Sequence, residues 1–554
     1  MGYKEEYKRW LENTSGDVLE ELKKMDETAI EDAFYQNLEF GTGGMRGTMG
    51  AGTNRLNVYM VAKASQGLAN YLGSGASVVI AYDSRINSER FAKTTASVLA
   101  ANGITVCIWP DISPVPTVSY GVRALHASAG VMITASHNPA SDNGYKVYGS
   151  DGCQITTETA KSILNKINAM DIFEDVRYFD YDKGLQSGRI QHITPEVLDA
   201  FLEDVKNQSV LFGDEIQKDV AIVYSPLNGT GLIPVTRVLS ETGFTNITVV
   251  EEQRNPDGTF PTCPYPNPEI REAMELGLEY CRKTGADLLL ATDPDCDRVG
   301  IAVRAGSDYQ LLTGNEVGLL LLDYICSQRV KHGRMPDHPV FVKTIVTMDM
   351  AEKIAAHYGV ETINVLTGFK FIGEVIGRLE ASGREKDFIF GFEESYGYLS
   401  GSYVRDKDGV GASFLICEMF AFYKTRGICL IDKLNELYKT YGYCLNTLHS
   451  YKFPGSTGMA KMKEIMSSLR NEANQGTMTI GGMEVERTED YLPGLNGLPK
   501  SNVLKFFTRK GSIVIRPSGT EPKLKIYISV MAEDRAEASK IEDEVRREME
   551  KRFA

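Results

Sequence analysis

Residues 130–149, GVMITASHNPASDNGYKVYG, place a hydroxyl nucleophile at the end of an apolar run and a lysine ten positions later. The apolar start predicts a buried strand, and polar groups just beyond the carboxyl end of such a strand lie where α/β sheets bind ligands. Ser136 is therefore a candidate catalytic group, and Lys146 is a candidate cation beside it. The Asn-Pro and Asn-Gly pairs also fit a plain turn without chemistry.

The segment DPDCDR at 293–298 carries Asp293, Asp295 and Asp297 at alternate positions, directly after the apolar run DLLLA. An extended segment would direct these carboxylates to one side, where a hard cation such as Mg²⁺ could bind them. A calcium EF-hand loop is excluded, because it needs Gly at Arg298 and Glu at Arg304. The alternative is an acidic turn with solvated carboxylates.

The segment RPSGTEPK at 516–523 joins a guanidinium, two hydroxyls and a glycine between two predicted strands. These groups suit a phosphate, although the spacing is not that of a Walker A loop. A simple hairpin turn is the alternative. The candidate ligands are Arg516, Ser518, Gly519 and Thr520.

Three further segments carry weaker signals. Arg46, in the glycine-rich stretch GTGGMRGTMGAGTN, could cover a ligand or belong to a flexible connection. Glu393 and Ser395, in GFEESYGY, would lie on one side of an extended segment and suit sugar hydroxyls, or form a solvated turn. Lys407, in VRDKDG, is a candidate phosphate contact or a surface charge.

The same succession of three apolar strands, with helical patterns between them, occurs three times along the chain. The third strand of each set runs into one of the polar segments described above: TASHNPA, DPDCDR or GFEESYGY. The strands begin near residues 77, 105 and 130, then 219, 246 and 286, then 339, 362 and 387.

The last 110 or so residues break this pattern, with two strands around RPSGTEPK and a charged helix from Glu533 onward. The sequence therefore predicts an α/β protein with three similar α/β domains of mixed sheets and a smaller C-terminal α+β domain. The predicted domains are 1–208, 209–325, 326–440 and 441–554.

The charge and the cysteine pattern of the sequence exclude some classes of function. The net charge of −14 argues against a nucleic-acid or anionic-membrane surface, although a local basic pocket could still bind a small anion. The nine cysteines form no C-x-x-C pair, which favours reduced thiols. The apolar run at 318–326, GLLLLDYIC, reads as a core helix, and the charged start MGYKEEYKRW is unlike a signal peptide, so the sequence predicts a cytoplasmic protein without a membrane span.

The motifs TASHNP, DPDCDR, GFEES and RPSGTEPK, in this order over essentially the whole chain, resemble the α-D-phosphohexomutase superfamily. The stretch FGTGGMRGTMGAGTNRLN and the spacing from TASHNP to NGYKVY resemble most its phosphoglucomutase and phosphomannomutase members, in the branch of phosphoglucomutase-2 and phosphopentomutase. The resemblance implies four domains around a central cleft, a phosphorylated serine, Mg²⁺ and glucose 1,6-bisphosphate as intermediate and activator.

Residue by residue, the resemblance implies that Ser136 carries the phosphate and binds the metal with the three aspartates, and that Lys146 and Arg46 are catalytic. One departure is Tyr403, which stands where several members of the superfamily have a histidine. The remaining implied residues bind substrate: His137, Arg298, Gly368, Phe369, Glu393, Ser395, Lys407, Arg516, Ser518, Gly519 and Thr520.

The predicted activity is that of an isomerase interconverting glucose 1-phosphate and glucose 6-phosphate. A phosphopentomutase or phosphomannomutase is the alternative within the superfamily, and a phosphatase or a non-catalytic sugar-phosphate binder are alternatives outside it. The expected partners are small sugar phosphates, and the expected assembly is a monomer or a homodimer.

Overall fold

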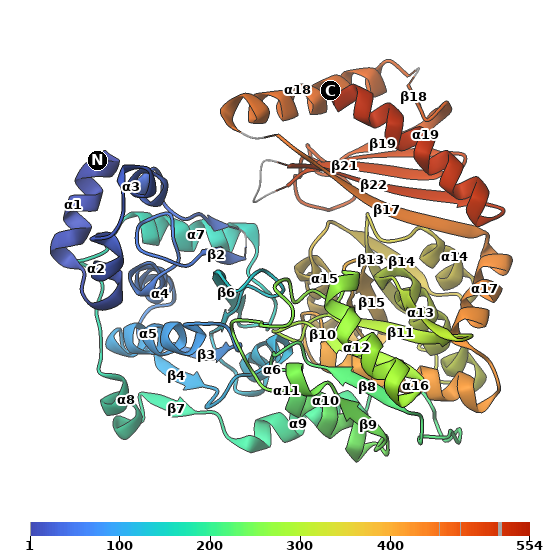
Figure 1. Cartoon of the computed structure of the whole chain (residues 1–554), viewed down its shortest axis with the longest axis horizontal. Helices are drawn as coiled ribbons and strands as arrows, with labels where there is room; N and C mark the ends of the chain where they lie inside the picture. Colours follow the sequence, from blue (N-terminus) through green and yellow to red (C-terminus); the bar gives the residue numbers. More distant parts are fainter. Residues whose placement is uncertain (1, 42, 454, 477, 519–522, 554) are drawn as a thin grey trace. The chain divides into compact units, whose positions relative to one another are not determined.

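The computed structural model describes residues 2–41, 43–453, 455–476, 478–518 and 523–553. The chain divides into two compact units (Figure 1). The first unit contains the residues up to Gly314, Phe369–Gly391 and Ser395–Arg426. The second contains Asn315–Gly368, Phe392–Glu394 and the residues from Gly427 onward.

The first unit opens with three short helices that pack around Trp10. Trp10 is fully buried, and its ring packs edge-on against the rings of Phe34 and Tyr59. Asp26 caps the third helix by accepting from the Ala29 backbone N–H. The helices are α1 (Tyr3–Asn13), α2 (Gly16–Leu22) and α3 (Glu27–Phe34).

A seven-stranded mixed sheet follows, in the order β1-β2-β6-β5-β3-β4-β7. Its strands are β1 (Phe40–Gly41), β2 (Gly44–Thr48), β3 (Ser77–Tyr82), β4 (Thr105–Ile108), β5 (Ala129–Ile133), β6 (Asp142–Gly149) and β7 (Ile190–His192). Its helices are α4 (Val58–Leu72), α5 (Ser88–Ala101), α6 (Val115–Ala124), α7 (Thr157–Asn168), α8 (Tyr181–Ser187) and α9 (Pro195–Lys206).

Strand β3 shows why this sheet is covered on both faces. Val78 and Ile80 belong to a core with residues of α4, α5 and α7, whereas Val79 and Ala81 belong to a core with residues of α6. Neighbouring residues of a strand point to opposite faces, so an unbroken apolar strand must be buried on both. Figure 1 shows the helices around these strands.

The second sheet of the first unit has the order β12-β11-β10-β8-β9. As in the first sheet, the first strand of the set lies between the third and the second, in parallel with both. Its strands are β8 (Ile222–Ser225), β9 (Ile247–Val249), β10 (Leu288–Thr292), β11 (Val299–Ala305) and β12 (Asp308–Leu312). Its helices are α10 (Leu232–Glu241), α11 (Glu251–Arg254) and α12 (Arg271–Thr284).

The third α/β set is divided between the units. In the second unit β13 and β14 pair in parallel, and the Phe392 ring lies 5.7 Å from that of Phe341. The elements are α13 (Gly314–Lys331), β13 (Val340–Thr344), α14 (Met350–His357), β14 (Glu361–Val365), α15 (Phe369–Ala381), the 3-10 helix η1 (Glu385–Asp387), β15 (Phe388–Glu393), β16 (Gly397–Leu399), α16 (Gly409–Thr425) and α17 (Leu430–Tyr441).

The C-terminal part of the second unit is an antiparallel sheet of order β17-β22-β21-β20-β19-β18, whose core includes side chains of two helices. The predicted fold class, α/β with a smaller C-terminal α+β domain, is confirmed. The elements are β17 (Tyr443–Lys452), α18 (Gly455–Asn474), β18 (Thr479–Ile480), β19 (Met483–Asp490), β20 (Leu504–Thr508), β21 (Gly511–Pro517), β22 (Lys523–Ala532) and α19 (Arg535–Phe553).

Two local predictions are wrong. The segments expected to be extended at 293–298 and 391–398 contain tight turns, in which Cys296 and Tyr396 have left-handed backbones with φ of 51° and 64°. The glycine-rich stretch from residue 41 is partly a strand, because β2 pairs with β6. Among the described helices, none is both long and apolar enough to cross a membrane.

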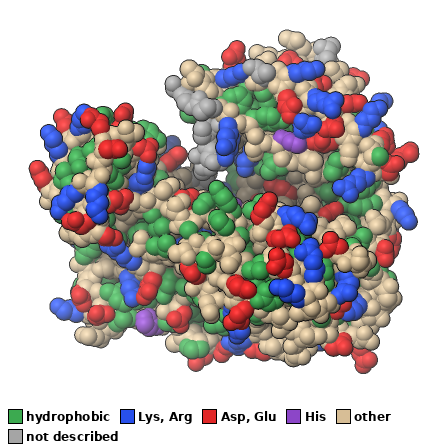
Figure 2. Space-filling view, in the orientation of Figure 1, with side chains coloured by type: hydrophobic (Ala, Val, Ile, Leu, Met, Phe, Trp, Pro, Cys, Tyr) green, Lys and Arg blue, Asp and Glu red, His purple; other side chains and the backbone are tan. Residues whose placement is uncertain are grey.

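Acidic and basic side chains are interspersed over the face of the molecule in Figure 2. The acidic excess of the sequence is therefore not gathered into a single patch on that face.

Candidate active site

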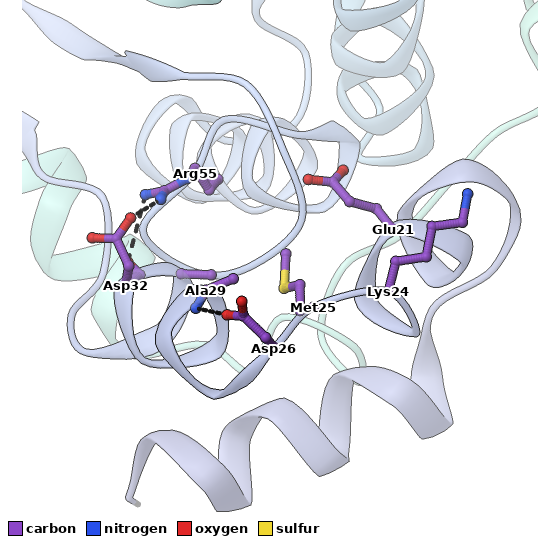
Figure 3. Close-up of a pocket in the computed structure, with 8 residues that line it drawn as sticks. Glu21, Lys24, Met25, Asp26, Ala29, Asp32 and Arg55 are labelled. Carbon is purple, nitrogen blue, oxygen red and sulfur yellow. Dashed lines mark hydrogen bonds and ion pairs between the residues drawn. The ribbon is translucent and has the colours of Figure 1, made fainter.

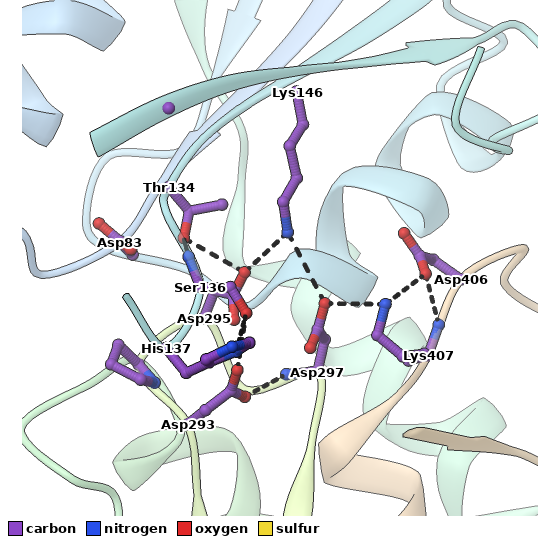
Figure 4. Close-up of polar contacts among 12 residues, drawn as sticks. Asp83, Thr134, Ser136, His137, Lys146, Asp293, Asp295, Asp297, Asp406 and Lys407 are labelled. Atoms are coloured by element: carbon purple, nitrogen blue, oxygen red, sulfur yellow. Dashed lines mark hydrogen bonds and ion pairs between the residues drawn. The ribbon is translucent and has the colours of Figure 1, made fainter. Parts of the chain in front are cut away.

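Ser136 lies three residues beyond β5 and is 3% exposed. Its backbone is left-handed, with φ of 55°, and its N–H donates to Thr134 Oγ1 at 2.8 Å. Its hydroxyl donates to Asp293 Oδ2 at 3.0 Å (Figure 4). The two polar segments that the sequence singled out, 157 residues apart, thus meet in one place.

The three aspartates converge because their segment turns. Cys296 N–H donates to the Asp293 carbonyl at 2.8 Å, and Asp297 N–H donates to Asp293 Oδ1 at 3.1 Å. One carboxylate oxygen from each of Asp293, Asp295 and Asp297 lies within 4.8 Å of the others, and all three residues are buried. The alternative of a solvated acidic turn is wrong.

Electrostatics make this cluster unfavourable without a counter-charge. Burial, with the neighbouring carboxylates, raises the pKa of Asp293 well above its usual range and also raises that of Asp297. Burial disfavours ionisation of Asp295 too, but Lys146, the hydrogen bond with Asp293 and the charge of Lys407 together outweigh burial and lower the pKa of Asp295. Asp295 Oδ1 and Asp297 Oδ1 are buried and accept no hydrogen bond from the described residues. These oxygens fit a divalent cation, which prefers carboxylate ligands.

Lys146 lies within β6, on the strand that returns antiparallel to β5 after the serine segment. Its Nζ is 2.9 Å from Asp295 Oδ2 and 3.7 Å from Asp297 Oδ2. Asp295 Oδ2 also accepts from Thr134 Oγ1 at 3.2 Å. The predicted cation therefore touches the aspartate cluster directly.

Lys407 is a second cation at the same cluster, with its Nζ 3.2 Å from Asp297 Oδ2. The residue is 8% exposed, so its interpretation as a surface charge is wrong. The same Nζ lies 5.7 Å from the ring centroid of Phe369, the first residue of α15.

Arg46 and His137 border the serine. Arg46 pairs with Gly144 across β2 and β6, and its exposed side chain donates to Asn138 Oδ1 at 3.4 Å. His137 Nδ1 is 3.2 Å from Ser136 Oγ. Burial, with the charges of nearby arginines, lowers the pKa of His137 well below 6.5, which favours a neutral imidazole.

Arg298 joins the aspartate loop to the segment before α12. Its guanidinium forms an ion pair with Glu269, and its backbone N–H donates to Asp293 Oδ1 at 3.0 Å. Its Nε is 3.8 Å from Asp297 Oδ1. Arg298 therefore contributes positive charge beside the aspartates.

The remaining predicted residues do not all lie in the first unit. In the second unit, Gly368 N–H donates to Glu393 Oε1 at 2.8 Å, and Arg516 Nη2 donates to the Tyr527 hydroxyl at 2.9 Å. Ser518 N–H donates to the Lys523 carbonyl, closing the strand ends of the predicted phosphate loop. Ser395 is partly exposed in the turn between β15 and β16. Gly519 and Thr520 lie outside the described residues.

Sequence reasoning missed a buried pair that holds the serine segment. Arg85 donates to the backbone carbonyls of Pro139 and Asp142 at 2.8 and 3.1 Å, and also to those of Ser136 and Asn138. Asp83 Oδ2 lies 3.3 Å from Arg85 Nε, and both side chains are inaccessible to solvent. The sequence could have indicated this pair, because the first strand, SVVIAYDSR, also ends in charged residues.

Tyr403, the departure named in the sequence analysis, contacts Asp408. Its hydroxyl donates to Asp408 Oδ2 at 2.5 Å, and Asp408 caps α16 by accepting from Val410 N–H. Tyr403 therefore supports the helix that follows the Lys407 segment.

The pocket in Figure 3 involves none of the predicted site residues. It has a volume of about 350 Å³ and lies among α2, α3 and Arg55. Arg55 forms an ion pair with Asp32, and Asp26 is the cap of α3. These partners give Arg55, Asp32 and Asp26 structural roles.

Family models match the chain in four segments, described as domains I, II and III and the C-terminal domain of phosphoglucomutase/phosphomannomutase. The chain belongs to the phosphoglucomutase/phosphomannomutase family. The matched residues are 37–172, 199–306, 313–441 and 468–548. The resemblance stated from the motifs is confirmed.

Curated relatives in this family are named phosphoglucomutase. That of Staphylococcus saprophyticus is 36% identical over 541 residues, covering 95% of this chain and 96% of its own. That of Staphylococcus aureus strain MSSA476 is 36% identical over 539 residues, covering 94% and 95%. The predicted enzyme class, an isomerase acting on hexose phosphates, is confirmed with the family.

Two solved structures share the fold. A phosphoglucomutase/phosphomannomutase family protein from Burkholderia thailandensis gives a TM-score of 0.67 at 18% identity, covering 93% of this chain and 97% of its own. The Paramecium phosphoprotein parafusin, a phosphoglucomutase in its open form, gives 0.69 at 16% identity, covering 94% of both chains.

Proposed function

We propose that the protein interconverts glucose 1-phosphate and glucose 6-phosphate, with Ser136 as the phosphate carrier and glucose 1,6-bisphosphate as intermediate. The observation that carries this proposal is the contact between Ser136 Oγ and Asp293 Oδ2, which places a nucleophile against a cluster built for a cation. In each half-reaction one phosphorus–oxygen bond breaks as another forms, so no water is consumed.

Asp293, Asp295 and Asp297, with the Ser136 phosphate, would hold Mg²⁺. The buried carboxylate oxygens without hydrogen-bond partners among the described residues support this assignment. When bound, the ion would supply positive charge that stabilises the transferring phosphoryl group.

The nearby cations neutralise the same charge. Lys146 lies between two carboxylates, and this position beside the aspartates supports a role in charge stabilisation. Lys407 approaches from the other side of Asp297, and Arg46 faces the serine segment through Asn138. His137 and Arg298 complete the polar surroundings of Ser136.

Substrate recognition would use the other polar segments. Glu393, oriented by the Gly368 N–H, would bind sugar hydroxyls, as would Ser395. Arg516, Ser518, Gly519 and Thr520 would hold the phosphate that is not reacting. The bisphosphate would then turn around, so that either phosphate can meet Ser136.

A substrate panel tests the proposal. The 1-phosphates of glucose, mannose, ribose and N-acetylglucosamine would be assayed with Mg²⁺ and catalytic glucose 1,6-bisphosphate, for isomer formation and for inorganic phosphate. We expect glucose 1-phosphate to give the highest kcat/KM and negligible phosphate release. Preference for mannose or ribose would reassign the substrate, and release of phosphate at the rate of turnover would indicate a phosphatase.

The Ser136→Ala variant tests the carrier. We expect wild-type protein incubated with the bisphosphate to gain the mass of one phosphate, whereas the variant gains none and has no turnover. Asp293 loses one donated hydrogen bond, but the fold should persist. A variant with normal turnover would contradict the assignment.

A further inference from the structure

We propose that Tyr148 and Asp406 are positioning residues that hold the Lys407 ammonium beside the metal-binding aspartates. The inference rests on the proposed function, because it assigns a catalytic purpose to the location of Lys407. The segments NGYKVY and VRDKDG contain Tyr148 and Asp406, but the sequence predicted no role for either residue.

A continuous set of contacts joins the four side chains. The Tyr148 hydroxyl donates to Asp406 Oδ2 at 2.9 Å. Asp406 Oδ1 accepts from the Lys407 backbone N–H at 2.8 Å and from Lys407 Nζ at 3.3 Å. The same Nζ reaches Asp297 Oδ2 at 3.2 Å (Figure 4). The ammonium is thus shared between a carboxylate of the site and a carboxylate outside it.

The residues around Lys407 restrict its side chain to one conformation. A Cβ at Gly397 would lie 2.1 Å from Lys407 Cδ, so the aliphatic stem occupies space that only glycine leaves open. The Phe369 ring lies on another side of the ammonium. Packing fixes the stem, and Asp406 and Asp297 fix the charge.

Tyr148 is well placed to orient Asp406. It lies on β6 two residues after Lys146, so both side chains point to the same face of the sheet. Tyr148 is fully buried opposite Gly130, where a Cβ would lie 2.7 Å from Val118 and 3.3 Å from Tyr148 Cβ. Strand β6 thereby positions two cations beside the aspartates. It carries Lys146 itself, and through Tyr148 and Asp406 it holds Lys407.

Burial makes this hydrogen bond consequential. Asp406 is 1% exposed, so water cannot readily replace a donor that is removed. Without the Tyr148 hydroxyl, the Asp406 carboxylate would rotate and Lys407 would lose its fixed distance from Asp297. A displaced charge weakens the transition state more than the bound substrate, so kcat should fall while KM changes little.

The test compares Tyr148→Phe with Tyr145→Phe. Tyr145 lies on the same strand, is equally buried, and its hydroxyl contacts Ser65 Oγ at 3.2 Å within the core. Each variant removes one buried hydroxyl from β6. Assayed with the best sugar phosphate of the panel, Tyr148→Phe should lose about tenfold in kcat, whereas Tyr145→Phe should lose stability alone.

A double-mutant comparison separates positioning from general destabilisation. Asp406→Asn should lower kcat to a similar extent, and Tyr148→Phe combined with Asp406→Asn should be no slower than Asp406→Asn alone. Independent effects that multiply would overturn the proposal. So would a Tyr148→Phe enzyme as fast as Tyr145→Phe.

Crystal structures provide a readout that does not depend on the substrate. We expect Lys407 Nζ to leave Asp297 in Tyr148→Phe and to stay in Tyr145→Phe. If the wild type converts no sugar phosphate, the proposed function fails while this comparison still decides the positioning. An unmoved Lys407 in Tyr148→Phe would overturn the positioning alone.

Discussion

The Arg85 guanidinium donates a hydrogen bond to the backbone carbonyl of Ser136. It also binds the carbonyls of Asn138, Pro139 and Asp142, so one buried side chain holds most of the serine segment. A left-handed serine is strained, and a rigid anchor of this kind keeps it in place.

We expect Arg85→Lys to lower mutase turnover by about ten- to a hundredfold, because a single ammonium cannot span four carbonyls as a planar guanidinium does. The rate at which glucose 1,6-bisphosphate phosphorylates Ser136 should fall by a similar factor. This rate is measured by mass spectrometry of the intact protein, at a temperature about 20 degrees below the melting temperature of the variant. Arg90→Lys, at an exposed ion pair with Asp17, is the control. Phosphorylation at the wild-type rate would show that Arg85 serves stability only.

Divalent cations should stabilise the folded protein, because three buried carboxylates repel one another in their absence. At a Mg²⁺ concentration about one hundred times Kd, the gain is about 2.7 kcal/mol, measured as a rise in melting temperature over protein in EDTA. Asp297→Asn should reduce this rise, whereas Asp308→Asn, at an exposed carboxylate, should not. An equal rise in both variants would place the binding of the ion elsewhere.

Glu380 gives a pH dependence of stability. Hydrogen bonds from Arg123, together with Arg405, lower the pKa of Glu380 to about 2, against 4.5 without them. Its ionic contribution is therefore fully present above pH 4.5 and is lost as the pH falls toward 2. Glu380→Gln should melt below the wild type at pH 7, and the gap should narrow at pH 3.5. Glu89→Gln, at a surface pair with Lys93, is the control; a gap independent of pH would refute the prediction.

Arg516→Ala should weaken substrate binding about ten- to a hundredfold, since charge-assisted hydrogen bonds contribute roughly 1.5 to 3 kcal/mol. The variant should also release the bisphosphate before it turns around, which leaves Ser136 unphosphorylated. Activity should then decay during the assay and recover when glucose 1,6-bisphosphate is added. Arg509→Ala, at an exposed arginine in the turn between β20 and β21, should show neither effect. Unchanged KM and steady progress curves in Arg516→Ala would leave that loop without a binding role.

Local patterns were enough to predict most strands and the segments that follow them. The runs at 130, 286 and 387 became β5, β10 and β15, because an apolar strand bounded by turn residues is specified by a few neighbouring positions. The candidate residues Ser136, Asp293 and Lys146 could likewise be chosen by type and position alone.

Contacts across long stretches of chain could not be predicted in this way. Tyr148 and Asp406 are 258 residues apart, in two segments whose sequences do not show that these side chains meet. The turn at 293–298 was missed because it depends on hydrogen bonds to Asp293 and on a left-handed Cys296, which residue types at alternate positions do not reveal.

The left-handed residues Ser136, Cys296 and Tyr396 follow β5, β10 and β15 by three or four positions. The three polar segments therefore share a backbone bend and differ in the side chains mounted on it: a hydroxyl, a set of carboxylates and a Glu-Glu-Ser triplet. Duplication of a single α/β unit would produce this pattern, in which each copy keeps the backbone bend and carries different side chains on it. The phosphate-carrier loop, the metal loop and the proposed sugar loop are then three variants of one bend, and exchanging residues between these bends is a route to altered members of the family.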